Sequence, residues 1–336
     1  MADQDPPSVC TARAAVATAD FNAIRVEHGP QNALVEGLEG FRLQAVEIRA
    51  ARAKTGLNIP MPVVRTIAEL GVGKTIGAQR LQAMHVPTDP ADVRRPVIIA
   101  TLDTTGMQIS VPQAILKALG KRNWNHATKP AIAWDRAHRA LRDHDVQLVV
   151  FDEMNRAARR PSMGAVIGGD LMDMLSEGDA AIAFLGTTEA NKVFNRVPAL
   201  ADRMKSPVVL KPLEWYDADE KAIFVAFLKM MDEAMADRGL VCEKAGLDDY
   251  VDPKAGEDSQ AGQNPSGSKD TARLLWEVCR GRLRPLCLLL EEGIRLIHYD
   301  NERLVLTHEV LAQAVENHSI ENGIISYNPF LGEKPA

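Results

Sequence analysis

The sequence has few cysteines, no long apolar run and no excess of positive charge. Its four cysteines are Cys10, Cys242, Cys279 and Cys287, and their spacing matches no metal site, so we expect a reduced, cytoplasmic compartment. No apolar run approaches the ~20 residues of a membrane-spanning helix, and the first residues lack the basic-then-apolar pattern of a signal peptide. The formal net charge of −6 argues against a nucleic-acid-binding protein that is basic over its whole surface, although a local basic face could still bind nucleic acid.

A glycine loop lies between a predicted strand at 63–69 and a predicted helix at 74–84, which is the context of a phosphate-binding loop. The loop contains Gly71, Val72, Gly73, Lys74, Thr75 and Ile76. Glycines let backbone N–H groups close around phosphate oxygens, and the helix N-terminus adds partial positive charge. Lys74 would reach the β- and γ-phosphates, and the Thr75 hydroxyl would bind Mg²⁺. Ala68 departs from the usual pattern, which has a glycine there. The alternative is a glycine turn with an unrelated lysine.

Two acids, Asp152 and Glu153, follow an apolar strand expected at 147–151. Open α/β sheets bind ligands at the carboxyl ends of their strands. We therefore expect Asp152 to hold Mg²⁺ through water, and Glu153 to act as general base on the attacking water. The alternative is an exposed acidic pair with no role in chemistry.

Strands and helices alternate up to residue 211, which predicts an α/β fold with a parallel sheet flanked by helices. The five strands are expected at 63–69, 97–102, 147–151, 181–186 and 207–211. The nucleotide-binding domain would occupy 30–212, opening with a helical segment at 30–54. After Pro212 the pattern is helical and predicts an all-helical lid over 213–320, with a flexible insertion at 248–270. Residues 1–29 and 321–336 are expected to be tails, the first of them flexible.

Three further residues could complete a site for nucleotide hydrolysis. Thr187 follows the fourth strand and could hydrogen-bond the attacking water or the γ-phosphate; Thr188 is the second choice, and helix capping is the alternative. Arg203 could reach the nucleotide of a neighbouring subunit as an arginine finger, or it could pair with Asp202 at the surface. Arg284, in the predicted lid, could fold over the bound phosphates or could face solvent.

Together these segments resemble AAA+ ATPases and, more narrowly, the TniB/TnsC-like transposition ATPases related to MuB. The resemblance covers about residues 30 to 320 and is carried by 71–75, 149–153, 184–188, 200–204 and 281–286. The narrower resemblance is carried by 97–103, by 113–120, and by a compact helical lid without an added DNA-binding domain.

The resemblance implies an AAA+ fold, with a five-stranded parallel sheet and a C-terminal helical lid, and ATP and Mg²⁺ as cofactors. It also implies a homo-oligomer, assembled on duplex DNA as a ring or a helical filament, that recruits a DDE transposase. A target-selecting protein of the TniQ type often takes part. ATP hydrolysis would then control disassembly of the oligomer.

Candidate DNA contacts come from three basic clusters. They are Lys117, Lys121 and Arg122; Arg136, Arg139 and Arg142, spaced i, i+3, i+6; and Arg156, Arg159 and Arg160. In a filament each subunit needs only a few phosphate contacts, because many subunits share the duplex. An acidic subunit can therefore still bind DNA. The alternative is that each cluster is a solvated helix face.

Two other functional classes fit the same motifs. A nucleotide-dependent scaffold would bind ATP and hydrolyse little of it, so that Glu153 would be nearly idle. A different AAA+ machine, such as a replication loader or a secretion-linked ATPase, would share the nucleotide site and would not interact with a transposase.

Overall fold

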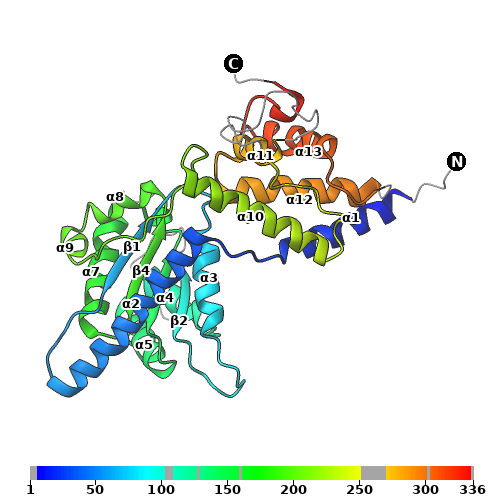
Figure 1. The fold of residues 1–336 in the computed structure, drawn as a ribbon. Coiled ribbons are helices and arrows are strands. Elements are labelled where there is room, and N and C mark those ends of the chain that lie inside the picture. Colours follow the sequence, from blue (N-terminus) through cyan, green and yellow to red (C-terminus); the bar gives the residue numbers. More distant parts are fainter. Residues whose placement is uncertain are drawn as a thin grey trace. The chain divides into compact units, whose positions relative to one another are not determined.

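The computed structural model describes residues 6–102, 109–126, 129–158, 161–250, 270–300 and 303–333. The chain forms two compact units (Figure 1). The α/β unit comprises Gly29–Lys211, and the helical unit combines Met1–His28 with Pro212–Ala336. Among the described residues, no helix is both long enough and apolar enough to cross a bilayer.

The α/β unit is built on a parallel sheet that has four strands in the described part of the chain: β1 (Val63–Ile67), β2 (Val97–Thr101), β3 (Leu148–Asp152) and β4 (Ala181–Gly186). Their order is β1-β4-β3-β2. Every residue of β3 and β4 is buried, which explains their uninterrupted apolar sequences. Because β4 lies between β1 and β3, it brings together the carboxyl ends of two strands that are distant in the sequence.

The predicted fifth strand at 207–211 is wrong. In its place Met204 forms a single parallel bridge to Val63, on the outer side of β1. Pro207 has no backbone N–H to donate to a strand ladder. Leu210 is buried, but Val209 is 71% exposed, and residues 207–211 form no strand pairing with β1.

Helices pack on this sheet and bury its apolar side chains. They are α2 (Gly29–Thr55), α3 (Lys74–Met84), α4 (Ser110–Ala118), α5 (Pro130–Asp143), α6 (Asn155–Ala158), α7 (Pro161–Glu177), α8 (Asn191–Phe194) and α9 (Pro198–Ala201), with a 3₁₀ turn η1 (Thr188–Ala190). Phe184 on β4 stacks against Phe151 on β3, with ring centroids 5.9 Å apart, and packs against Phe194 of α8 at 5.2 Å. These rings tie the two central strands to the helix layer.

The helical unit contains α10 (Ala218–Asp237), α11 (Thr271–Cys279), α12 (Leu283–Asp300) and α13 (His308–Ala314), which continues as a π-helical turn η2 (Val315–Ile320). A 3₁₀ turn η3 (Pro329–Leu331) follows near the end of the described chain. Tyr327 to Phe330 is packed rather than loose, because the buried Asn328 side chain donates to the carbonyl of Ala312 at 2.9 Å. Of the predicted insertion, residues 251–269 lie outside the described residues.

The flexible tail predicted for residues 1–29 is also wrong, because Pro7–Asn22 forms helix α1. Ala17 and Phe21 lie on one face of α1 and belong to the core of the helical unit. The Arg13 guanidinium donates to the carbonyl of His298 on α12 at 2.6 Å. The first helix is therefore part of the unit that the last third of the chain builds.

Gly281 links α11 to α12, and we predict that the helical unit does not tolerate a side chain there. Its φ is +69°, and an added Cβ would lie 2.0 Å from the Leu213 carbonyl oxygen, which Trp276 holds by a 2.7 Å hydrogen bond. Gly323 has a similar φ of +66° with nothing within 4 Å, so it is the matched control.

We expect Gly323→Ala to lower the free energy of unfolding by about 1 kcal/mol, the cost of left-handed backbone for a residue with a Cβ. Gly281→Ala should cost at least about 2 kcal/mol more, through the added clash. Urea unfolding followed by circular dichroism measures both, and equal losses would contradict the role of the Leu213 contact.

Candidate nucleotide-binding site

The loop after β1 turns on two glycines in left-handed backbone. Gly71 has φ +86°, and Gly73, which immediately precedes α3, has φ +92°. The carbonyl of Gly73 accepts the first helical hydrogen bond, from the N–H of Gly77 at 2.9 Å. Ala68 is buried and is not among the positive-φ residues, so its backbone does not require glycine. The departure at Ala68 therefore introduces no strain in the loop.

Lys74 is buried under this loop, with 9% of its surface exposed. Its ammonium donates to the carbonyl oxygens of Ala68 at 2.9 Å and Glu69 at 2.6 Å. Burial lowers the pKa of Lys74, and the nearby carboxylates of Asp152, Glu153 and Glu69 oppose that shift. The lysine thus closes the loop on itself, and an incoming phosphate would have to replace carbonyl oxygens as its acceptor.

Thr75 and Asp152 join the loop to the end of β3. The Thr75 hydroxyl donates to Asp152 Oδ2 at 2.7 Å, and Asp152 Oδ1 accepts from the backbone N–H of Glu153 at 2.8 Å. A hydroxyl and a carboxylate are hard oxygen ligands, the type that Mg²⁺ prefers. No group of three or more His, Cys, Asp or Glu side chains within the described residues could hold a metal. The donor set fits Mg²⁺, which typically completes its shell with phosphate oxygens and water.

Glu153 has an unusual backbone and two polar neighbours. Its φ is +57°, which is rare for a residue with a Cβ and recurs at functional sites. Its carboxylate lies 3.6 Å from the guanidinium of Arg156 and accepts a 3.4 Å hydrogen bond from the Asn155 side chain. Arg156, predicted to contact DNA, is therefore paired with the candidate general base. The sequence analysis did not predict Asn155 as a site residue. Its position two residues after Glu153 does not reveal that its side chain is buried.

The end of β4 lies between these two segments. Ile67 at the end of β1 is in register with Gly186, and the N–H of Ala68 donates to the Gly186 carbonyl at 3.1 Å. On the other side, the N–H of Met154 donates to the Leu185 carbonyl at 2.9 Å. Thr187 therefore follows the strand that separates the loop from the acids. It precedes η1 in extended backbone, and its side chain makes no capping hydrogen bond.

The two candidate arginines lie in different units. Arg203 is exposed just after α9 and forms no ion pair with Asp202 within the described part of the chain. Its guanidinium is therefore accessible at the surface of the α/β unit. Arg284 is exposed in the first turn of α12, in the helical unit.

The basic clusters differ in how far the structure describes them. Lys117, Lys121 and Arg122 lie at the end of α4 and in the segment after it, and the second cluster lies on α5. Arg159 and Arg160 lie outside the described residues.

We predict that restoring glycine at position 68 does not tighten nucleotide binding. Ala68→Gly should leave the affinity for a fluorescent ATP analogue unchanged and lower stability by about 1 kcal/mol, because glycine loses more conformational freedom on folding. Gly73→Ala is the contrasting variant. Its left-handed backbone would cost about 1–2 kcal/mol with alanine, and we expect weaker binding. A tenfold tighter affinity in Ala68→Gly would contradict this account of the loop.

Comparison with known proteins finds a family model that matches part of the chain. The family model for the bacterial TniB protein matches residues 52–214. The structure of the ORC2 protein of Aeropyrum pernix in its ADPNP–ADP complexes is similar, with 13% identity, a TM-score of 0.51 and coverage of 83% of this chain and 67% of that one. The ADP form of the same protein has 14% identity and a TM-score of 0.50, and the match covers 85% of this chain and 69% of that one. No curated protein matches this chain.

This chain thus spans about two thirds of the length of the ORC2 chain. At sequence identities of 13% and 14%, the structural similarity shows a shared fold alone. The fold is that of AAA+ proteins, which confirms the predicted class, with four strands in place of five within the described residues. The matched segment contains all four strands, the loop with Lys74 and Thr75, and the acids Asp152 and Glu153. Residues 52–214, just under half of the chain, are thus similar to the bacterial TniB protein.

Proposed function

We propose that this protein is an ATPase that binds ATP with Mg²⁺ and regulates DNA transposition. The observation that carries the proposal is the 2.7 Å hydrogen bond from Thr75 to Asp152, next to the buried ammonium of Lys74. It joins the two halves of a phosphate and magnesium site that lie 77 residues apart. The TniB family match supports transposition, rather than replication loading or secretion, as the process served.

The residues divide the chemistry of hydrolysis among them. Lys74 would bind the β- and γ-phosphates, while Thr75 and Asp152 would hold Mg²⁺, Asp152 through water. The metal would supply positive charge against the charge that develops on the phosphates. Glu153 would accept a proton from the attacking water, which Thr187 would orient. Arg203 of a neighbouring subunit would stabilise the transferring group. Arg284 would fold over the bound phosphates.

Assembly is the proposed purpose of the ATPase cycle. Subunits would oligomerise on duplex DNA with ATP bound, as a ring or a helical filament, and recruit a DDE transposase, with or without a TniQ-like target-selecting protein. Hydrolysis would then release subunits and so limit where insertion occurs. Arg203 is exposed and has no ion pair within the described residues, which supports a site that a second subunit completes.

A scaffold that hydrolyses little ATP is the second candidate, and one observation favours it. Arg156 lies 3.6 Å from the carboxylate of Glu153, so the oxygen that would accept a proton from water already has an ion-pair partner. If the pair persists with nucleotide bound, Glu153 is held from the attacking water and assembly alone is the function.

Two variants separate binding from hydrolysis. Glu153→Gln should bind a fluorescent ATP analogue as the parent does, but turn over ATP at least about 100-fold more slowly, the usual contribution of a general base. Lys74→Ala should lose measurable ATP binding, because the proposal gives its ammonium the contacts to the β- and γ-phosphates. Phosphate release with and without duplex DNA is the measurement. A Glu153→Gln protein as fast as the parent would rule out the general base, and a parent that is inactive even with DNA would favour the scaffold.

The arginine finger makes a prediction about protein concentration. Turnover per subunit should rise with concentration in the parent and stay low in Arg203→Ala, while ATP affinity is unchanged. The expected loss is on the order of 1,000-fold in the assembled form. Arg94→Ala is the matched control, because Arg94 is an exposed arginine of the same unit that pairs with Asp92. A parent whose turnover per subunit does not depend on concentration would contradict a finger acting between subunits.

A further inference from the structure

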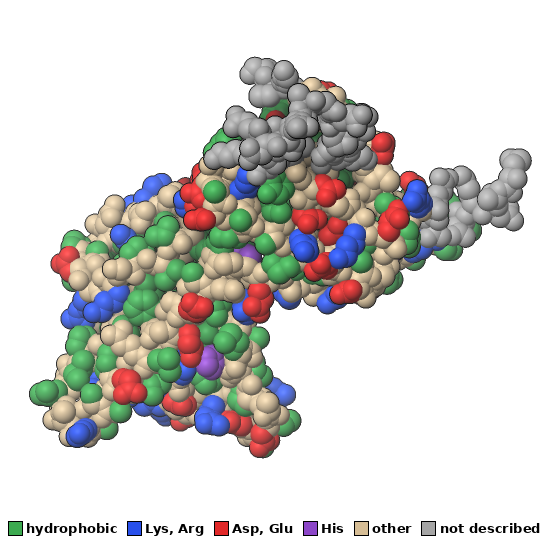
Figure 2. Space-filling view, in the orientation of Figure 1, with side chains coloured by type: hydrophobic (Ala, Val, Ile, Leu, Met, Phe, Trp, Pro, Cys, Tyr) green, Lys and Arg blue, Asp and Glu red, His purple; other side chains and the backbone are tan. Residues whose placement is uncertain are grey.

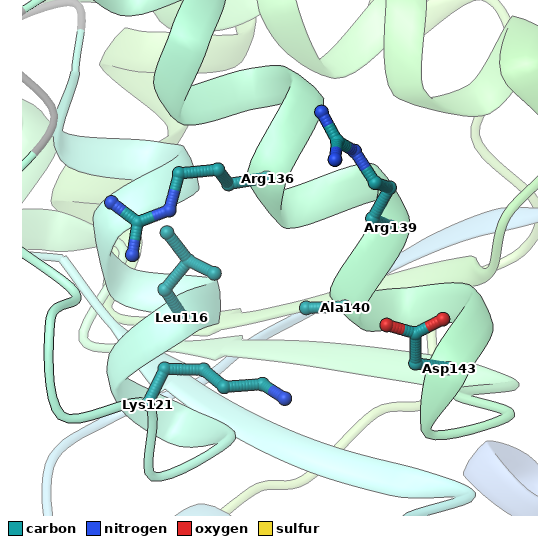
Figure 3. A pocket seen from close by; sticks show the side chains of 6 residues that line it. All are labelled: Leu116, Lys121, Arg136, Arg139, Ala140 and Asp143. Carbon is teal, nitrogen blue, oxygen red and sulfur yellow. The ribbon is translucent and has the colours of Figure 1, made fainter.

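A shallow cavity of about 240 Å³ lies between α4 and α5, and none of its lining residues belongs to the candidate nucleotide site. Figure 3 shows its six lining side chains: Leu116, Lys121, Arg136, Arg139, Ala140 and Asp143. The first two come from α4 and the segment that follows it, and the other four come from α5. The cavity therefore joins two basic clusters that are separate in the sequence.

Three cations face this cavity against a single carboxylate, Asp143. The Lys121 ammonium has no partner within the described residues. The Arg136 guanidinium donates to the carbonyl of Asn123 at 2.7 Å, which fixes its position and leaves other N–H groups for a ligand. Arg139 forms an exposed pair with Asp135, an interaction that contributes little and can be exchanged for a stronger anion.

Neighbouring basic residues extend the charge beyond the cavity. Arg122 is exposed on the same segment as Lys121, and Lys117 lies 5.5 Å from the ring centre of Trp124. Arg142, by contrast, is exposed but is paired with the buried carboxylate of Asp179 at 3.0 Å. The chain as a whole has a net charge of −6, and acidic and basic side chains are interspersed on the face seen in Figure 2. The positive charge around the cavity is thus a local concentration.

We infer that this cavity binds one phosphate group of the backbone of duplex DNA. Guanidinium groups and ammonium groups recognise phosphate oxygens through charge-assisted hydrogen bonds. The volume corresponds to roughly eight waters at about 30 Å³ each, which is enough for a phosphate group and some of its hydration. None of the six lining residues is aromatic, so no ring could stack on a base. The contact would therefore be to the backbone and independent of sequence.

The identity of the ligand as DNA rests on the proposed function, in which many subunits share a duplex. One phosphate per subunit is sufficient in that arrangement, because the contacts of neighbouring subunits add along the DNA. It also explains how a chain with a negative net charge could bind a polyanion.

The test removes two cavity cations and compares the result with the removal of two cations elsewhere. The cavity variant is Lys121→Ala with Arg139→Ala. The control is Arg94→Ala with Arg95→Ala, an exposed pair in the same α/β unit that removes the same charge. Fluorescence anisotropy of a labelled duplex, with ATP and Mg²⁺ present, gives the affinity over a series of salt concentrations.

We expect the cavity variant to bind DNA about tenfold more weakly, and its slope of log K against log salt to fall by about 1 for each phosphate that the subunit no longer binds. The control should stay within about twofold of the parent, and two unrelated duplexes should give the same result. Lys121→Gln, which keeps the length of the side chain, should show a smaller decrease in affinity in the same direction if the double variant folds poorly.

Several results would overturn the inference. An unchanged slope in the cavity variant, or an equal decrease in affinity in the control, would show that the cavity is not a phosphate site. A polyglutamate peptide bound by the parent but not by the cavity variant, with unchanged DNA binding, would assign the cavity to an acidic protein partner. If the parent bound no DNA, this inference would fail, while titration with the ATP analogue in the same samples would still test the nucleotide site.

Discussion

The parallel pairing of β4 between β1 and β3 is the constraint on which the rest of the α/β unit depends. It requires three strands from distant parts of the sequence to end at one edge of the sheet. The register of Ile67 with Gly186 and the hydrogen bond between Met154 and Leu185 then leave little freedom in how the loop and the acids meet. The hydrogen bond between Thr75 and Asp152 is a consequence of that pairing, not its cause.

The candidate nucleotide site is held closed by the chain's own groups. Lys74 donates to loop carbonyls, and Glu153 is paired with Arg156. Nucleotide binding on this geometry is an exchange of partners, because each phosphate contact of Lys74 replaces an existing hydrogen bond. The net gain in binding free energy is the difference between the new contact of Lys74 with phosphate and its lost hydrogen bond to a carbonyl. This difference is favourable, because a hydrogen bond to a charged phosphate is stronger than one to a neutral carbonyl. A similar exchange would apply to Glu153, whose present partner is the guanidinium of Arg156.

Much of the α/β unit could be predicted because its determinants are local. Buried apolar runs mark β3 and β4, and the spacing of Gly71, Gly73 and Lys74 marks the loop. The fifth strand was a false prediction, since β-branched Val208 and Val209 outweighed Pro207 in the pattern although they lie outside the sheet. The convergence of Lys121 with Arg139 depends on how α4 packs against α5, and no spacing in the sequence encodes it. The burial of Asn155 is likewise a tertiary fact.

The helical unit is discontinuous in the sequence, and this has a consequence for synthesis of the chain. Arg13 and His298, which bond to each other, are 285 positions apart. At a translation rate of about 5–20 residues per second, their encounter is delayed by on the order of tens of seconds. Throughout that interval Ala17 and Phe21 of α1 lack their partners on α12, while the whole of Gly29–Lys211 has already been synthesised. The nascent protein would therefore hold α1 without α12 until the ribosome has completed that helix.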